Sequence, residues 1–160
     1  MRRLLAGIAI AGVALAGDAD AQTATQVVRF QVNAVSQIAV SGNPTPMVVN
    51  SAVAGNAPTA VTSTGTRYAV TTNETNQKIT ASIDQPLPSG VSLEVNLAPP
   101  AGASSAGNVP LSTAGSDVVT GISNTAESAL PITYRLIATP TASMSSPASR
   151  TVTLTIVAGT

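Results

Sequence analysis

Apolar and polar residues alternate with a period of two along much of the chain, a pattern that predicts β-strands. In the clearest case, apolar residues occupy every second position from Val91 to Leu97. The same pattern predicts strands at residues 28–34, 37–40, 67–72, 78–83, 117–122, 132–138 and 151–156. No stretch after residue 21 has an apolar stripe at helical spacing. We therefore predict an all-β fold, an Ig-like antiparallel two-sheet β-sandwich of about eight strands.

Turn-forming residues separate most of the predicted strands. Residues 73–76 (Asn-Glu-Thr-Asn) indicate a hairpin, and Pro86 and Gly90 mark the next break in the strand pattern. Three longer connections are rich in Ala, Ser, Gly, Pro and Thr: residues 41–64, 98–116 and 139–149. Loops longer than about 12 residues are uncommon in compact domains and are often functional. We also expect a short extra strand within residues 47–53.

The first residues have the pattern of a secretory signal. Two arginines precede the uncharged apolar run 4–16, and an Ala-x-Ala cleavage pattern ends at residue 21. This run is shorter than the roughly 20 residues that span a bilayer, and no second long apolar run follows, so we expect no transmembrane anchor. The sequence predicts a signal peptide at 1–21 and a single β-sandwich domain at 22–160. We expect a secreted protein, in the periplasm, at the cell surface or in the extracellular space.

Composition argues against most catalytic chemistry. The chain has no His and no Cys, which removes the usual nucleophile pairs, the usual zinc ligands and any disulfide. No phosphate-binding glycine loop or calcium-binding carboxylate cluster occurs. The net charge is zero, with no basic patch for nucleic acid. We therefore predict no enzymatic activity, no catalytic or metal-ligating residues and no cofactor.

The five carboxylates after residue 21 are scattered along the chain: Glu74, Asp84, Glu94, Asp117 and Glu127. Surface positions explain them best, and Glu94 could pair across strands with Arg135 or Arg29 on the polar strand faces. A hydrolase acting through two carboxylates, such as Glu94 and Asp117, is the alternative. Residues 73–75 match a glycosylation sequon, although a plain turn is the simpler interpretation.

Aromatic residues are few, so the core must be largely aliphatic. Only Phe30, Tyr68 and Tyr134 are aromatic. Both tyrosines are in phase with core positions of their strands, and we expect them in the core. A glycan-binding platform of exposed aromatic rings is therefore unsupported, although a glycan ligand is still possible.

The first and last predicted strands after the signal peptide are long and nearly uncharged. Residues 27–35 and 150–157 each contain one Arg and no other charged residue. An uncharged strand at a sheet edge is a template for pairing with another chain. The simpler interpretation, which we favour from sequence, is that both strands lie inside the sandwich or pair with each other.

The signal peptide, the body rich in Val, Thr, Ala and Ser, the near-zero charge and the closing strand 150–157 together resemble bacterial secreted Ig-like or fimbrial-type β-sandwich proteins. The resemblance is one of general pattern and carries no site residues. Chaperone-assembled pilins often contain a disulfide, which this chain cannot form.

These observations lead to two hypotheses of function. The first is an exported non-enzymatic structural or adhesive protein, a subunit or accessory of a surface layer, filament or matrix, with protein partners or self-assembly through its terminal strands. The alternative is an extracellular glycan- or peptide-binding module that uses long loops at one end of the sandwich, including residues 98–116.

Overall fold

The computed structural model describes residues 22–143 and 146–160. The chain divides into two compact units, Met1–Val32 and Asn33–Thr160. Within the first unit, the described residues 22–32 form neither helix nor strand. The expected signal peptide, residues 1–21, lies outside the described residues. All of the described strands belong to the second unit.

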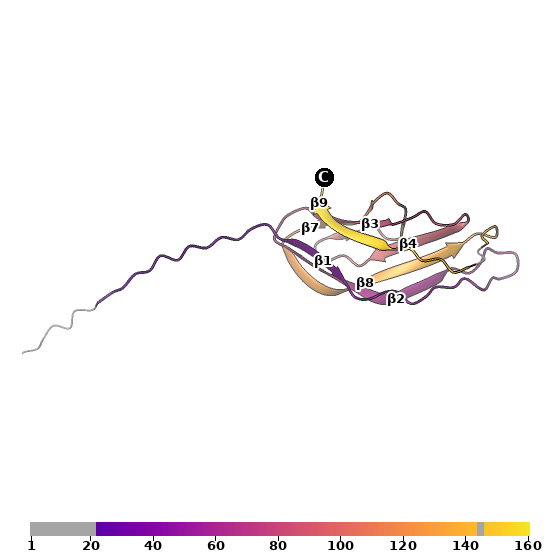
Figure 1. The fold of residues 1–160 in the computed structure, drawn as a ribbon, viewed down its shortest axis with the longest axis horizontal. Coiled ribbons are helices and arrows are strands. Elements are labelled where there is room, and N and C mark those ends of the chain that lie inside the picture. The colour runs from indigo at the N-terminus through magenta and orange to yellow at the C-terminus, as the bar shows by residue number, and fades with distance from the viewer. Residues whose placement is uncertain (1–21, 144–145) are drawn as a thin grey trace, which may run out of the picture. The chain divides into compact units, whose positions relative to one another are not determined.

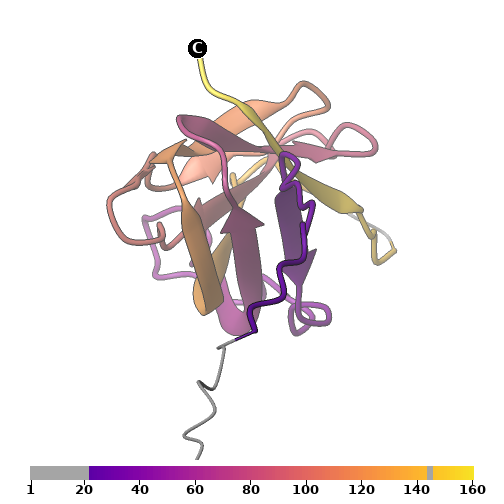
Figure 2. The ribbon, with the colours of Figure 1, turned by 90° about the vertical axis from the view of Figure 1, so that its left-hand side faces the viewer.

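The second unit is an antiparallel β-sandwich of two sheets, which confirms the predicted fold class (Figures 1 and 2). The five-stranded sheet has the order β1 (Ser36–Val40), β2 (Val61–Thr72), β8 (Thr125–Ala138), β4 (Val91–Leu97) and β6 (Val109–Pro110). The four-stranded sheet has the order β5 (Ser104–Ser105), β7 (Ser116–Ile122), β3 (Gln77–Ile83) and β9 (Val152–Ala158). The sheet edges are therefore β1, β6, β5 and β9.

The core lies between the two sheets and is mostly aliphatic, as its sequence pattern requires. Successive side chains of a strand point to opposite faces, so one alternating set from each strand turns inward. Strand β3 shows this most clearly, since Ile79, Ala81 and Ile83 are buried and the residues between them are not. No residue in the range 22–32 is buried. The buried core of the sandwich therefore contains no residue of that segment.

Several predicted strands match the observed ones closely, including β3, β4, β7 and β9. Strands β2 and β8 begin well before their predicted starts, and their pairing contains register shifts near Ser63 and Tyr68. On β8, Ala129 adopts a positive φ of 58° near the second shift. The shift after Ser63 on β2 and the irregularity at Ala129 on β8 interrupt the period-two pattern, which explains why the first part of each strand was not predicted.

The predicted hairpin at residues 73–76 is wrong. Strand β2 belongs to the five-stranded sheet and β3 to the four-stranded sheet, so this connection crosses between the sheets. A second crossing, from β7 to β8, lies beside it: Asn124 N donates to Glu74 O, and Asn76 N donates to Ser123 Oγ. Residues 47–53 contribute only an isolated bridge between Ala52 and Pro58 instead of a strand.

The expectation for the two terminal strands is also wrong. Residues 28–34 form no strand, and the first strand, β1, begins at Ser36. Strand β9 pairs with β3 on one side and lies at the edge of its sheet. Residues 28–34 therefore form no strand of the sandwich, whereas β9 is a sandwich strand that lies at a sheet edge, and the two segments do not pair with each other.

Candidate functional site

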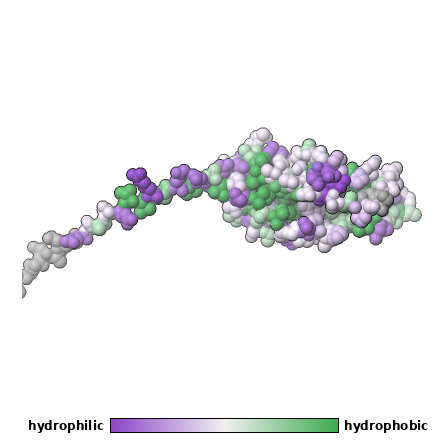
Figure 3. Space-filling view, viewed as in Figure 1, coloured by the Kyte–Doolittle hydropathy of each residue, from purple (hydrophilic) through white to green (hydrophobic). Residues whose placement is uncertain are grey.

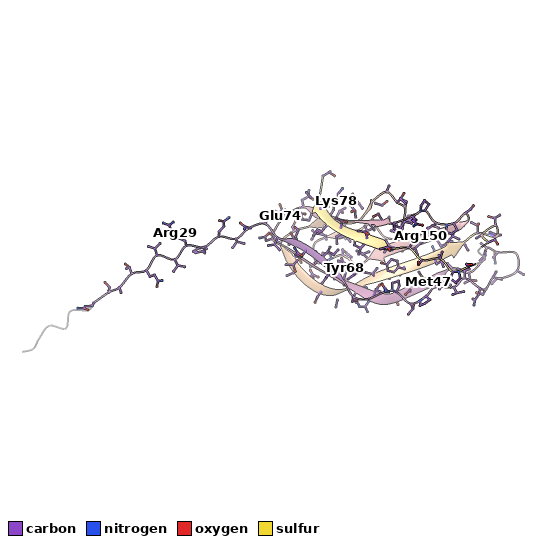
Figure 4. The ribbon with its side chains drawn as sticks, viewed as in Figure 1. Arg29, Met47, Tyr68, Glu74, Lys78 and Arg150 are labelled. Atoms are coloured by element: carbon purple, nitrogen blue, oxygen red, sulfur yellow. The ribbon has the colours of Figure 1, made fainter. Side chains whose placement is uncertain are left out.

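The segment before β1 exposes an unusual amount of apolar surface. Within residues 27–32, the exposed fractions of Val27, Val28, Phe30 and Val32 lie between 70% and 91%. In an extended strand, the side chains at positions 28, 30 and 32 would share one face, and Val27, Arg29 (Figure 4) and Gln31 would share the other. The segment thus has the side-chain pattern of a half-buried strand while none of it is buried.

Asn73 holds the chain where this segment meets the sandwich. Its side-chain Oδ1 accepts a hydrogen bond from Val35 N at 2.7 Å, and its Nδ2 donates to Asn33 O at 2.8 Å. Its backbone N also donates to Val35 O at 3.1 Å. Residues 33 and 35 are therefore fixed to the start of the crossing connection, and the sequon nitrogen is already occupied by a structural bond. This role of Asn73 could not be predicted from local sequence, because the bonded partners are about 40 residues apart.

Strands β1 and β9 lie side by side at the same margin of the sandwich, although they belong to different sheets. We call their apolar side chains the β1/β9 seam: Ile38 and Val40 of β1, and Val152, Leu154 and Ile156 of β9. All except Val40 pack against the core while remaining partly exposed, and Val40 is exposed. Figure 3 shows hydrophobic residues gathered in this region of the sandwich, between the positions of β1 and β9 in Figure 1.

The backbone of β9 has a free side. Asp84 N donates to Thr151 O at 3.1 Å, and Gly159 N donates to Asn76 O. In an antiparallel pair the residues alternate between bonding to the partner and facing away from it. The continuous register between these two bonds therefore directs the N–H and C=O groups of Val152, Leu154 and Ile156 away from β3, toward the side where β9 pairs with no described strand.

Each of the five carboxylates contacts a nearby group in the sandwich. Glu94 Oε2 lies 3.0 Å from Arg135 Nη1, which confirms the predicted cross-strand pair, and Arg29 lies in the segment before β1 instead. Asp117 Oδ2 lies 3.1 Å from Lys78 Nζ. The other three accept hydrogen bonds from Gln77 Nε2 (Glu74), Thr151 N (Asp84) and Ala101 N (Glu127). These contacts tie strands and connections together, as expected for structural carboxylates.

Both tyrosines are in the core, as predicted, with 1% of Tyr68 and 7% of Tyr134 exposed. The Tyr68 hydroxyl donates to Ala98 O at 2.6 Å. Burial, together with the nearby Glu127 carboxylate, raises the pKa of Tyr68 to about 12. Burial also raises the pKa of Tyr134. Neither ring is placed to serve as a surface platform for a glycan.

Two shallow depressions occur on the sandwich. One, of about 430 Å³, is lined by Val35, by the end of β2 with Asn73, and by the start of β8 with Asn124. The other, of about 320 Å³, brings together two of the long connections, at residues 49–58 and 138–142. The connection at 98–116, which the loop-binding hypothesis named, lines neither of them.

Among the described residues, no group of three or more Asp and Glu side chains is placed to hold a metal ion. No helix in the described part of the chain is long and apolar enough to cross a membrane. Comparison with known protein families, with characterised proteins and with solved structures found no match.

Proposed function

We propose that this chain is an exported, non-enzymatic structural or adhesive protein whose copies assemble with one another, as a subunit or accessory of a surface layer, filament or matrix. The observation that carries the proposal is the segment 27–32, in which four large apolar side chains are exposed and three of them, at positions 28, 30 and 32, have the spacing of one strand face.

Burial of the apolar side chains of this segment would stabilise an assembly of copies. Moving one Val or Phe side chain from water to an apolar contact is worth about 1.5–3 kcal/mol. Three such side chains on one strand face favour association strongly, even after the cost of ordering the segment. An added strand also gains main-chain hydrogen bonds to its new neighbour.

The composition supports the non-enzymatic part of the proposal. The chain has no His and no Cys, and its carboxylates are engaged in structural contacts. The first 21 residues support export by their signal-like pattern. Low charge on the segment and on β9 reduces the repulsion that would keep copies apart.

Light scattering after size-exclusion chromatography, followed by negative-stain microscopy, tests the proposal on residues 22–160. We expect ordered oligomers or filaments for the unmodified chain and monomers for Phe30→Glu, which places a charge on the apolar face. Gln31→Glu adds the same charge to the polar face and is the matched control; it should still assemble.

A chain that remains monomeric at its highest soluble concentration would refute self-assembly. The loop-based binding hypothesis would then become the leading one. Equal assembly of Phe30→Glu and the unmodified chain would show that some other surface carries the association.

A further inference from the structure

We infer that residues 26–32 of one copy add as a strand to the free side of β9 in a second copy. The added strand would extend the four-stranded sheet and cover the β1/β9 seam. This inference rests on the proposed self-assembly and names the surface that receives the segment.

The length of β9 distinguishes it from the other sheet edges. Strands β5 and β6 have two residues each and β1 has five, whereas β9 has seven. An incoming strand forms a ladder of main-chain hydrogen bonds with the edge strand, and a longer edge strand allows more hydrogen bonds in that ladder. On β9 the free groups belong to Val152, Leu154 and Ile156, evenly spaced along the strand.

Side-chain polarity matches on both faces of the proposed pair. Neighbouring strands of a sheet turn side chains at the same level to the same face. Apolar residues 28, 30 and 32 would therefore join the inward residues 152, 154 and 156, which are partly exposed and gain burial from a neighbour. On the outer face, Arg29 and Gln31 would lie beside the exposed Thr153 and Thr155. No charge would be buried, because β9 contains none and Arg29 stays outside.

The occupant is a second copy, because the same chain would have to reverse direction immediately before β1. That reversal would fall at residues 33–36, and Asn73 holds both Asn33 and Val35 by hydrogen bonds at 2.7–3.1 Å. The sequence there, Asn-Ala-Val-Ser, also has no Gly or Pro to form a tight turn. We take the pairing as antiparallel, as in every strand pair of the sandwich.

Cysteine cross-linking tests the inference cleanly because the chain has no native Cys. A Gln31→Cys chain of residues 22–160 is mixed with a Thr153→Cys or Thr155→Cys chain and oxidised. These positions are exposed, so the sandwich should tolerate the substitutions. We expect mixed disulfide dimers with the β9 variants. Two control variants report on other sheet edges. Gln37→Cys lies on β1, the edge of the five-stranded sheet, and Ser104→Cys lies on β5, the opposite edge of the four-stranded sheet. Both should cross-link to Gln31→Cys several-fold less than the β9 variants.

Amide hydrogen exchange gives a second, substitution-free measurement. In the assembly, the amides of Leu154 and Ile156 should exchange about tenfold more slowly, or slower still, than in the monomeric Phe30→Glu chain, because each gains an N–H···O bond. The amides of Thr153 and Thr155, which already bond to β3, should change much less.

The outcomes separate this inference from the proposed function. Cross-links that favour Gln37→Cys or Ser104→Cys, or assembly without any protection at Leu154 and Ile156, would overturn the β9 site while self-assembly through the segment would stand. A chain that does not assemble at all would overturn both.

Discussion

Tyr68 is the large polar side chain most deeply placed in the sandwich, and replacing it with Phe isolates the contribution of one hydroxyl. The ring is 1% exposed, and its hydroxyl reaches from β2 to Ala98, directly after β4, in the same sheet. Tyr68→Phe keeps the ring and removes only the 2.6 Å hydrogen bond to Ala98 O. We expect a folded but less stable sandwich.

The expected loss of stability depends on the net contribution of this hydrogen bond relative to hydrogen bonds with water. A hydrogen bond of this kind contributes a net 0.5–1.5 kcal/mol or so to stability. Ala98 is partly exposed, so water can hydrogen-bond to its carbonyl in the variant. The larger loss of stability that follows from an unpaired buried carbonyl is therefore avoided. We therefore expect a loss of about 1 kcal/mol in the free energy of unfolding at neutral pH. For a domain of this size that corresponds to a fall of roughly 3–5 °C in Tm.

The same substitution should change the response to alkaline pH. The pKa of Tyr68 is raised to about 12 in the folded chain, from about 10 in an unfolded one. Below pH 10 or so both states keep the proton, so the full stability is present. As pH rises further, the unfolded state loses its proton first, and the wild-type sandwich loses stability until the folded pKa is passed. Tyr68→Phe lacks this group, so the gap between the two proteins should narrow above about pH 10.

Urea unfolding at neutral pH and at about pH 9 and pH 11 measures both effects. Tyr134→Phe serves as the control at neutral pH, because the Tyr134 hydroxyl donates to no described residue; its loss should be smaller. Wild-type stability of Tyr68→Phe at neutral pH would refute the contribution of the bond. A gap that stays constant up to about pH 11 would refute the raised pKa.

Two further substitutions test local features of the sandwich. Gly90 has a φ of +77°, and a Cβ there would lie 2.6 Å from Thr139 Oγ1, so Gly90→Ala should cost about 2 kcal/mol in chemical unfolding. Gly102→Ala shares the positive φ but has open space around it, and should cost about half as much; equal losses would contradict the steric part of the argument. Asp117→Asn removes the partly exposed ion pair with Lys78 and should cost less than about 1 kcal/mol, with a smaller effect at high salt.

The sequence predicted the fold class and most strands because burial leaves a period-two signature. Strand β4 was predicted with its observed bounds, since nothing interrupts the alternation from Val91 to Leu97. The first half of β8 was missed, because Ala129 with its positive φ and Pro131 break the pattern there. Local periodicity therefore identifies regular strands and loses irregular ones.

Which strands pair cannot be derived from the same signal. Residues 73–76 connect β2 to β3, but the two strands lie in different sheets. A turn sets the local direction of the chain and does not determine which strand pairs with the next one. Residues 28–34 alternate as well as any strand of the sandwich, but they pair with no strand in the described part of the chain. The alternating segment and the unpaired edge of β9 suggest strand addition only when the structure shows that one molecule has both.

The pairing of β3 with β9 has a consequence for the order in which the chain acquires structure. Asp84 and Thr151, which join the two strands, are 67 residues apart, and β3 lies in the middle of its sheet. The ribosome must therefore release residues up to β9 before β9 can pair with β3. Folding dominated by such distant contacts is slow, on the order of milliseconds to seconds. We expect a long interval in which the nascent chain is still unfolded, and the proposed export would require the chain to be threaded through its translocation channel in this state.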